Sequence, residues 1–260
     1  PPRLVMQSSQ GTFSENLLKG ISAEKLGKTE NMGILLFDAN NDGFNDLYFA
    51  NGSSEFLPNS ESFRDWLMIN DGKGGFQYDS TAIPSWLGSK SCVKATDMDN
   101  DGDLDLFVGE RIIPGSYPQP ASGSIYRNDS KNGKAVFTDV TELVAPSLKN
   151  MGMICDAIWS DFNNDGWVDL IIAGEWMPLV FMQNTHGKLK KINAGPSVDH
   201  ATGWWNSITA ADVDNDGDVD YIAGNLGTNS FYRADTLHPV SIYAKDFDNN
   251  GKTDAIPFLF

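Results

Sequence analysis

The chain has 260 residues, a formal net charge of −16 and a hydrophobic fraction of 40%. This acidic balance argues against nucleic acid or an anionic membrane as partner. No apolar run approaches the ~20 residues that a membrane helix requires. The chain begins at Pro1 without an initiator Met, so we expect a piece of a longer protein, one domain of a larger surface protein that does not itself span the membrane.

The first predicted element is a hairpin over residues 3–17, "RLVMQSSQGTFSENL". Two short runs flank a turn that contains glycine, which is typical of antiparallel strands. Similar stretches occur at 66–81, 124–141 and 179–194, each with Asn, Gly or Ser at its tip. We expect each of them to be a pair of strands.

Between these hairpins one nonapeptide recurs five times with the pattern D-x-[DN]-x-[DN]-G-x-x-D. The copies are "DANNDGFND" (38–46), "DMDNDGDLD" (97–105), "DFNNDGWVD" (161–169), "DVDNDGDVD" (212–220) and "DFDNNGKTD" (246–254). Positions 1, 3, 5 and 9 of the copies hold seventeen of the 35 acidic residues, so the acidity of the chain belongs largely to these loops. Five copies without a gap exclude a chance match.

The residue types in this pattern point to a hard divalent cation. Side chains at positions 1, 3 and 5 converge, the glycine at position 6 permits the turn, position 7 offers its carbonyl and position 9 completes the shell. Because the donors are oxygens, without His or Cys, Ca²⁺ is favoured over zinc or copper, and Mg²⁺ prefers more water. The alternative is a set of Asx turns without metal.

We therefore predict up to five Ca²⁺ ions. The expected ligands are Asp38, Asn40, Asp42, Phe44 and Asp46; Asp97, Asp99, Asp101, Asp103 and Asp105; Asp161, Asn163, Asp165, Trp167 and Asp169; Asp212, Asp214, Asp216, Asp218 and Asp220; and Asp246, Asp248, Asn250, Lys252 and Asp254.

The flanks of the loops exclude an EF-hand, which needs a glutamate at position 12. Here that position holds Phe49, Val108, Ile172, Ala223 and Pro257. Apolar runs rich in β-formers precede and follow each loop, for example "GILLF" and "LYFA". We expect strand–loop–strand units, each followed by a hairpin, which makes four strands per unit.

Repeated four-stranded antiparallel units predict an all-β fold. We expect a β-propeller with the metal loops between strands 1 and 2 of each blade. The expected blades within a single domain over 1–260 are approximately 19–81, 82–143, 144–196, 197–240 and 241–260, with 1–18 as a possible closing hairpin. An arc of a larger propeller is the alternative to a closed ring.

These units resemble the FG-GAP/VCBS-type calcium-binding repeats of integrin α-subunit propellers and of the cartilage acidic protein family. The phrases "GEW", "ADVDNDGDVDYIAGNLG" and "PVSIYAKDFDNNGKTD" are similar to large bacterial surface proteins that carry this repeat. The FG and GAP phrases themselves are mostly missing. The resemblance implies an extracellular, cell-surface or periplasmic protein, which agrees with loops that saturate at millimolar calcium.

The face opposite the calcium loops is the expected ligand face, because its connections differ most between units. The residues expected there are Asn51, Glu110, Arg111, Glu175, Trp176, Trp204, Trp205 and Asn225, with His200 nearby. Exposed tryptophans stack on sugar rings, and paired carboxylates can do acid–base work. Ion pairing of Glu110 with Arg111 and packing of Trp176 and Trp204 between blades are the structural alternatives.

We expect a non-catalytic binding or adhesion module for a glycan or protein ligand. The alternative is a carbohydrate-active enzyme, because some polysaccharide lyases and sugar dehydratases use related propellers. The histidines show no ligand or triad spacing. Cys92 and Cys155 precede their acidic loops by five and six residues, so they should face opposite ways and remain separate thiols.

Overall fold

The structure is a computed structural model that describes residues 2–16, 18–227, 230–235 and 237–259. Strands dominate it, and its helical segments are short. These segments are α1 (Ala23–Gly27), η1 (Glu61–Phe63), α2 (Thr141–Val144), η2 (Pro146–Leu148) and α3 (Pro196–Asp199). Among the described helices none is long and apolar enough to cross a membrane. The predicted all-β class is confirmed.

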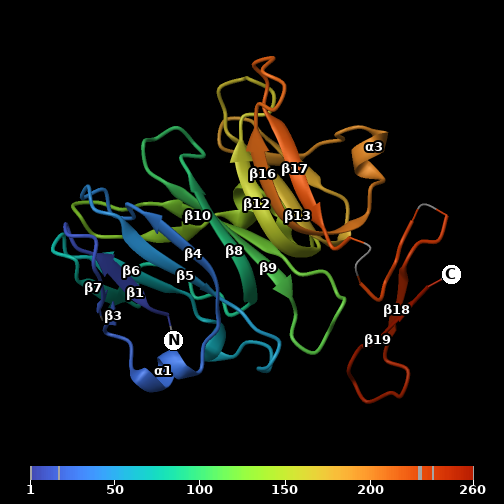
Figure 1. Ribbon diagram of the computed structural model, residues 1–260, viewed down its shortest axis with the longest axis horizontal. Helices are drawn as coiled ribbons and strands as arrows, with labels where there is room; N and C mark the ends of the chain where they lie inside the picture. The colour runs from blue at the N-terminus through green and yellow to red at the C-terminus, as the bar shows by residue number, and fades with distance from the viewer. Residues whose placement is uncertain (1, 17, 228–229, 236, 260) are drawn as a thin grey trace.

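Three four-stranded antiparallel units, which we call blades 1, 2 and 3, form the body of the molecule (Figure 1). Blade 1 is β4 (Asn31–Phe37), β5 (Asp46–Asn51), β6 (Trp66–Asn70) and β7 (Phe76–Asp79). Blade 2 is β8 (Ser89–Thr96), β9 (Asp105–Ile112), β10 (Gly123–Asn128) and β11 (Phe137–Asp139). Blade 3 is β12 (Met153–Ser160), β13 (Asp169–Met177), β14 (Val180–Asn184) and β15 (Leu189–Lys191). Within each blade the strands pair in chain order.

Shorter strand pairs flank these blades. Blade 4 consists of β16 (Gly203–Ala211) and β17 (Asp220–Asn225), and β16 also pairs with β13. Two separate hairpins are β1 (Leu4–Gln7) with β2 (Phe13–Asn16), and β18 (Ser241–Lys245) with β19 (Asp254–Phe258). The short β3 (Leu18–Lys19) pairs in parallel with β7. The two hairpins lie at opposite ends of the arc of blades (Figure 1), and the predicted blade boundaries and closing role stay predictions.

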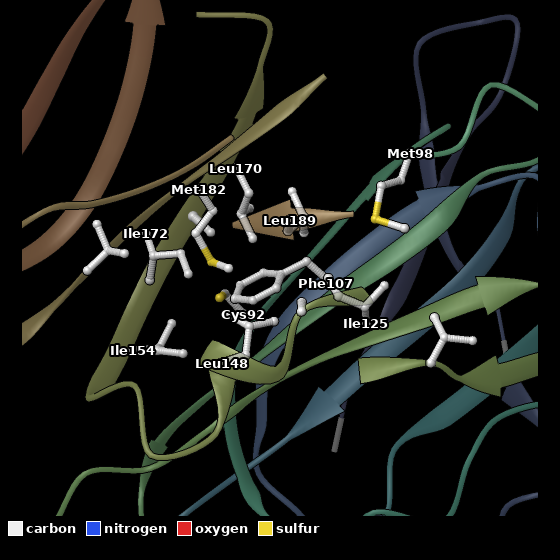
Figure 2. Packing of buried hydrophobic residues seen from close by; sticks show 14 of the residues in the cluster. Cys92, Met98, Phe107, Ile125, Leu148, Ile154, Leu170, Ile172, Met182 and Leu189 are labelled. Carbon is white, nitrogen blue, oxygen red and sulfur yellow. The ribbon is translucent and has the colours of Figure 1, made fainter. Parts of the chain in front are cut away.

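The blades pack face to face, and this explains the apolar runs of the sequence. Every residue of β5 is buried, because blade 2 packs on one face of this strand and N-terminal residues such as Leu4 and Leu18 pack on the other. Phe107 of β9 lies at the centre of the cluster between blades 2 and 3, where it packs with Leu170 and Met182 (Figure 2). Its ring also meets Trp159 edge to face, with the ring centroids 6.5 Å apart.

Both cysteines are free thiols. Cys92 is buried in the cluster between blades 2 and 3, and Cys155 on β12 is half-buried. Burial raises the pKa of Cys92 to about 12 and that of Cys155 to about 11. Both are therefore protonated at neutral pH.

Candidate metal centre and ligand face

Each acidic nonapeptide folds onto its own first aspartate. Asp38 accepts hydrogen bonds from the backbone N–H groups of Asp42 (3.1 Å) and Gly43 (2.7 Å). Position 4 is asparagine in every loop and lies in the left-handed region, which asparagine tolerates better than most residues. These residues are Asn41, Asn100, Asn164, Asn215 and Asn249, with φ between 56° and 61°. The pattern in the sequence analysis assigned no residue type to position 4, although all five copies have asparagine there.

Carboxylates converge in three of the loops. Asp97, Asp99 and Asp101 each offer an oxygen, and these atoms lie within 4.8 Å of one another. The same holds for Asp212, Asp214 and Asp220, and for Asp246, Asp248 and Asp254. In the loops at 38–46 and 161–169 an asparagine occupies position 3 and donates to the aspartate at position 5, at 2.9 Å in each case.

Asp99 has an unsatisfied polar atom. Its Oδ1 is buried and has no hydrogen-bond partner. Burial raises the pKa of this carboxyl, and the negative charges of Asp101 and Asp97 raise it further. A buried carboxylate oxygen without a partner, among like charges, is unfavourable unless a cation neutralises it. The donor set of this loop therefore fits a hard divalent cation.

The aspartate at position 9 connects the loop to the blade through hydrogen bonds. Its Oδ2 accepts a backbone N–H from position 2, as in Asp46 with Ala39 at 2.9 Å. Its Oδ1 accepts the backbone N–H of an asparagine that ends the third strand. The pairs are Asp46 with Asn70 (2.7 Å), Asp105 with Asn128 (2.8 Å) and Asp169 with Asn184 (2.7 Å).

Burial is the main cause that raises the pKa of these three aspartates, to about 6 for Asp46, about 7 for Asp105 and about 6 for Asp169. The asparagine partners were missed by the sequence analysis. Their signal was the recurrence of Asn at the end of each third run, in "MIN", "YRN" and "MQN".

Neighbouring acidic loops touch one another across blades. Asn41 Nδ2 donates to Asp103 Oδ1 at 2.5 Å, and Asn164 Nδ2 donates to Asp218 Oδ1 at 3.2 Å. The first pair joins the loops of blades 1 and 2, and the second joins those of blades 3 and 4. The loops therefore lie side by side on one face of the molecule.

On the opposite face the predicted polar ring is largely internal. Asn51 is fully buried, accepts from Asn31 Nδ2 (2.6 Å) and donates to the carbonyl of Arg64 (2.5 Å). Glu110 is 8% exposed and accepts from the backbone N–H groups of Ser89 and Ser122. Both side chains thus form hydrogen bonds that hold the end of the second strand of their blade against adjacent residues. Burial raises the pKa of Glu110.

Glu175 and Arg111 come together across blades. Arg111 of β9 donates through Nε to Glu175 Oε1 at 2.7 Å and also forms an ion pair with this oxygen through its second terminal nitrogen at 2.5 Å. Glu175 is 2% exposed, and its Oε2 is buried without a partner. The alternative pairing of Arg111 with Glu110 is therefore replaced by one with Glu175, because β9 packs against β12 of blade 3 and this brings Arg111 to the end of β13.

The tryptophans next to Glu175 form an aromatic corner. Trp176 and Trp204 are half-buried, with ring centroids 5.5 Å apart and planes tilted by 43°. Trp176 lies in a β-bulge at φ 58°, a strained value for a bulky residue. Its Nε1 donates to the hydroxyl of Tyr117 at 2.7 Å. Trp205 instead packs into the apolar cluster between blades 3 and 4.

A pocket of about 630 Å³ opens beside this corner. Trp176 and Trp204 form one side of it, and the exposed Asn225 and His200 contribute polar groups. More of the lining comes from Tyr232, Ala234, Asp235, Pro239 and Val240. Three of the predicted ligand-face residues, Trp176, Trp204 and Asn225, therefore gather with His200 around this pocket, whereas Asn51 and Glu110 serve the interior.

Comparison with known proteins agrees with this architecture. The FG-GAP-like repeat matches residues 38–108 and 161–223, which together are just over half of the chain. The chain belongs to the FG-GAP-like repeat family. FG-GAP-like repeats indicate an integrin-like extracellular binding module.

A curated relative is a T-cell immunomodulatory protein homolog from Plasmodium yoelii yoelii. It is 28% identical to this chain over 151 residues, which cover 55% of the chain and 20% of the relative. The chain therefore matches about a fifth of the length of that relative.

Proposed function

We propose that this FG-GAP chain is a calcium-stabilised extracellular module that binds a glycan or protein ligand on the face opposite its acidic loops. The observation that carries the calcium part is the cluster of Asp97, Asp99 and Asp101 around the buried, unpartnered Asp99 Oδ1. The aromatic corner of Trp176 and Trp204 carries the ligand part. A cell-surface or periplasmic location supplies the millimolar calcium that such loops require.

Calcium would be held by the carboxylates, amide oxygens and position 7 carbonyls of the five loops. It supplies positive charge where the chain places several carboxylates side by side. Because the convergent geometry requires the folded loop, the ion binds the native state and stabilises it by mass action, by about 2.7 kcal/mol at a hundredfold excess over Kd. Hydrogen bonds join the loops of blades 1 and 2 and those of blades 3 and 4, so this stabilisation extends across neighbouring blades.

The calcium proposal is tested by thermal melting in EDTA, in CaCl₂ and in MgCl₂. We expect Tm to rise with calcium and to rise much less with magnesium. Asp99→Asn should weaken calcium binding in isothermal titration, while Glu55→Gln, an exposed acidic control outside the loops, should not. Equal Tm values in EDTA and CaCl₂ would refute calcium stabilisation.

Two features of the aromatic corner support the ligand proposal: the strained backbone of Trp176 and the exposed polar groups of the adjacent pocket. Trp176 retains an unfavourable φ because Tyr117 and Trp204 hold its ring in place, and such strain concentrates at functional sites. Half-buried tryptophans offer flat apolar surface with a polar edge, which suits a sugar ring or an aromatic side chain of a protein. The pocket of about 630 Å³ is large enough for a small ligand group.

A glycan and polysaccharide array on the calcium-loaded chain tests this site. Trp204→Ala and Trp176→Ala should each abolish the hits that the wild type gives, with calcium-dependent melting retained. Leu57→Ala is the matched control, since Leu57 is 81% exposed in the connection after β5 and lies outside the pocket. Hits that survive both tryptophan variants would place the ligand elsewhere.

The geometry favours binding over acid–base catalysis. Glu110 and Glu175, the paired carboxylates that an enzyme would use, both accept hydrogen bonds from protein groups and are nearly buried. Neither is presented as a free acid or base to the pocket. Turnover of an array hit, measured as new reducing ends or unsaturated products, would instead establish the carbohydrate-active enzyme.

A further inference from the structure

A second pocket lies on blade 2, apart from the pocket beside Trp176 and Trp204. Its volume is about 680 Å³, and the two pockets share no lining residue. It is formed by residues 84–86 before β8, by residues 122–124 at the start of β10, and by α2 with Lys149. The acidic loop of blade 2 joins the other ends of β8 and β9, so this pocket also opens on the face opposite the acidic loops.

Apolar side chains make up much of the wall of this pocket. Trp86 is half-buried and packs against the cluster between blades 1 and 2, and Val140 and Leu143 line the pocket with it. The Nζ of Lys90 lies 5.2 Å from the centroid of the Trp86 ring. Because Lys90 is 1% exposed, it lies on the inner side of this ring and leaves the pocket side to a ligand.

One nearly buried hydroxyl group of the pocket has no partner. Ser124 is 7% exposed and lines the pocket, and among the residues that the structure describes none forms a hydrogen bond with its Oγ. Ile125 lies in the cluster between blades 2 and 3 and Tyr126 in the cluster between blades 1 and 2. Since side chains alternate along β10, Ser124 points to the side of Tyr126, where Trp86 also packs. A ligand in the pocket can supply the missing hydrogen bond.

The hydroxyl groups of the other serines and of the threonine in this pocket differ from that of Ser124, because two of them accept hydrogen bonds from backbone N–H groups and one accepts from an arginine. These bonds run from Asn150 to Ser122 (3.0 Å), from Ile125 to Thr141 (2.9 Å) and from Arg64 to Ser85 (2.7 Å). They hold the walls of the pocket in place. The Oγ of Ser124 is therefore the hydroxyl oxygen that this set leaves for a ligand.

Charged groups of both signs stand at the rim. Asp139 and Glu142 contribute carboxylates, and Lys149 contributes an ammonium group whose Nζ lies 3.7 Å from Glu142 Oε1. An anionic ligand would meet the two carboxylates, and a cationic ligand would meet Lys149 and the Lys90 charge behind Trp86. The rim therefore favours a neutral ligand whose groups both donate and accept hydrogen bonds.

We propose that this pocket binds one ring of a neutral sugar. The apolar C–H face of the ring lies on Trp86, one hydroxyl bonds Ser124 Oγ, and others reach the charged groups of the rim. A sugar suits the mixed donors and acceptors because each hydroxyl can do both, and the volume lies within the range of small-molecule sites. The site is separate from the aromatic corner, so it does not rest on the proposed function.

Titration followed by NMR tests the site. The neutral probes are methyl glucoside, methyl galactoside and methyl mannoside, with methyl glucuronide as the anionic and glucosamine as the cationic counterpart. The protein is the calcium-loaded Trp204→Ala chain, in which the aromatic corner lacks one ring. The indole N–H signal of Trp86 is identified by its loss in Trp86→Phe. We expect a neutral glycoside to shift this signal to saturation and the charged sugars to bind more weakly.

Two variants measure the contributions of the wall and of the hydroxyl, with affinities taken from saturation-transfer NMR of the sugar. Ser124→Ala should weaken binding by about three- to tenfold, because one hydrogen bond is lost. It should leave Tm unchanged, since this Oγ has no partner in the described chain, so the test does not depend on a variant that fails to fold. Trp86→Leu should weaken binding by about tenfold or more, and Trp86→Phe should restore part of the loss.

Ser54→Ala is the matched control, because Ser54 is exposed and lies outside both pockets. It should change neither the affinity nor Tm. Three results would overturn the proposal: no saturating shift with any neutral glycoside, tighter binding of a charged sugar than of the neutral ones, or equal affinities in Ser124→Ala and Ser54→Ala. Array hits of the wild type that Trp204→Ala abolishes report on the aromatic corner instead, so failure of one site is distinguished from failure of the other.

Discussion

Lys90→Met should strongly destabilise the fold, because Lys90 is a charged residue inside the contact between blades 1 and 2. Lys90 is 1% exposed. Its Nζ donates to the carbonyl of Phe63 at 2.7 Å and to that of Trp86, and lies 3.4 Å from Asp65 Oδ1. Removal of the ammonium group therefore leaves a buried carboxylate and two carbonyls without their charged donor.

Asp65 keeps only neutral partners in this variant. It is 4% exposed and accepts from the hydroxyl of Tyr48 at 2.7 Å and from the N–H of Asn51 at 2.8 Å. Removal of one partner of a buried ion pair costs about 3–5 kcal/mol. For a chain of this size each kcal/mol corresponds to about 2–4 °C in Tm, so we expect a fall of about 6–20 °C.

The loss should depend on pH. Burial raises the pKa of Asp65, and the charge of Lys90 opposes this shift. Without Lys90 the folded-state pKa rises further above the unfolded value, so the ionised carboxylate destabilises the fold at neutral pH. The destabilisation should shrink as pH falls through the folded-state pKa of Asp65, because the neutral acid is tolerated in the interior.

Chemical denaturation at pH 7 and pH 5 measures both effects. Lys73→Met, at an exposed turn, is the control for loss of one positive charge. The double variant Lys90→Met, Asp65→Leu should recover much of the stability, because no unpaired charge is left inside. A change below about 1 kcal/mol in Lys90→Met, or no recovery in the double variant, would refute the buried-pair reasoning.

Three further outcomes are expected. Asn128→Ala should cost about 1–3 kcal/mol in urea denaturation, because its buried side chain donates to the carbonyls of Ala39 and Leu104, and a loss near zero would contradict this role. Asp103→Ala removes the bond from Asn41 of the neighbouring loop and should reduce coupling between their calcium sites, and an unchanged titration curve would show that the loops bind independently. Cys92 should resist labelling by a thiol reagent at pH 8 until the chain unfolds, since a pKa of about 12 leaves about 10⁻⁴ of it as thiolate, and fast native labelling would contradict its burial.

The sequence by itself determined the repeated unit of this protein. The acidic nonapeptide, the apolar runs on both sides and the hairpins with turn residues are local patterns, and the structure has the four strands of blades 1 to 3 where these patterns predict them, while the described part of blade 4 has only two. The physical reason is that strand, turn and loop preferences act over a few residues. The carboxylates that cluster in the structure, such as Asp97 and Asp99, are also close in sequence, so their convergence could be read from spacing.

Only the tertiary structure decided which residues meet across blades. Arg111 pairs with Glu175 instead of its neighbour Glu110, and Asn51 lies inside the protein instead of on a ligand face. The partner of Asp105 is the backbone of Asn128, in the third strand. These contacts join residues that are far apart along the chain, and face-to-face packing of whole blades sets them, so no pattern confined to one unit could reveal them.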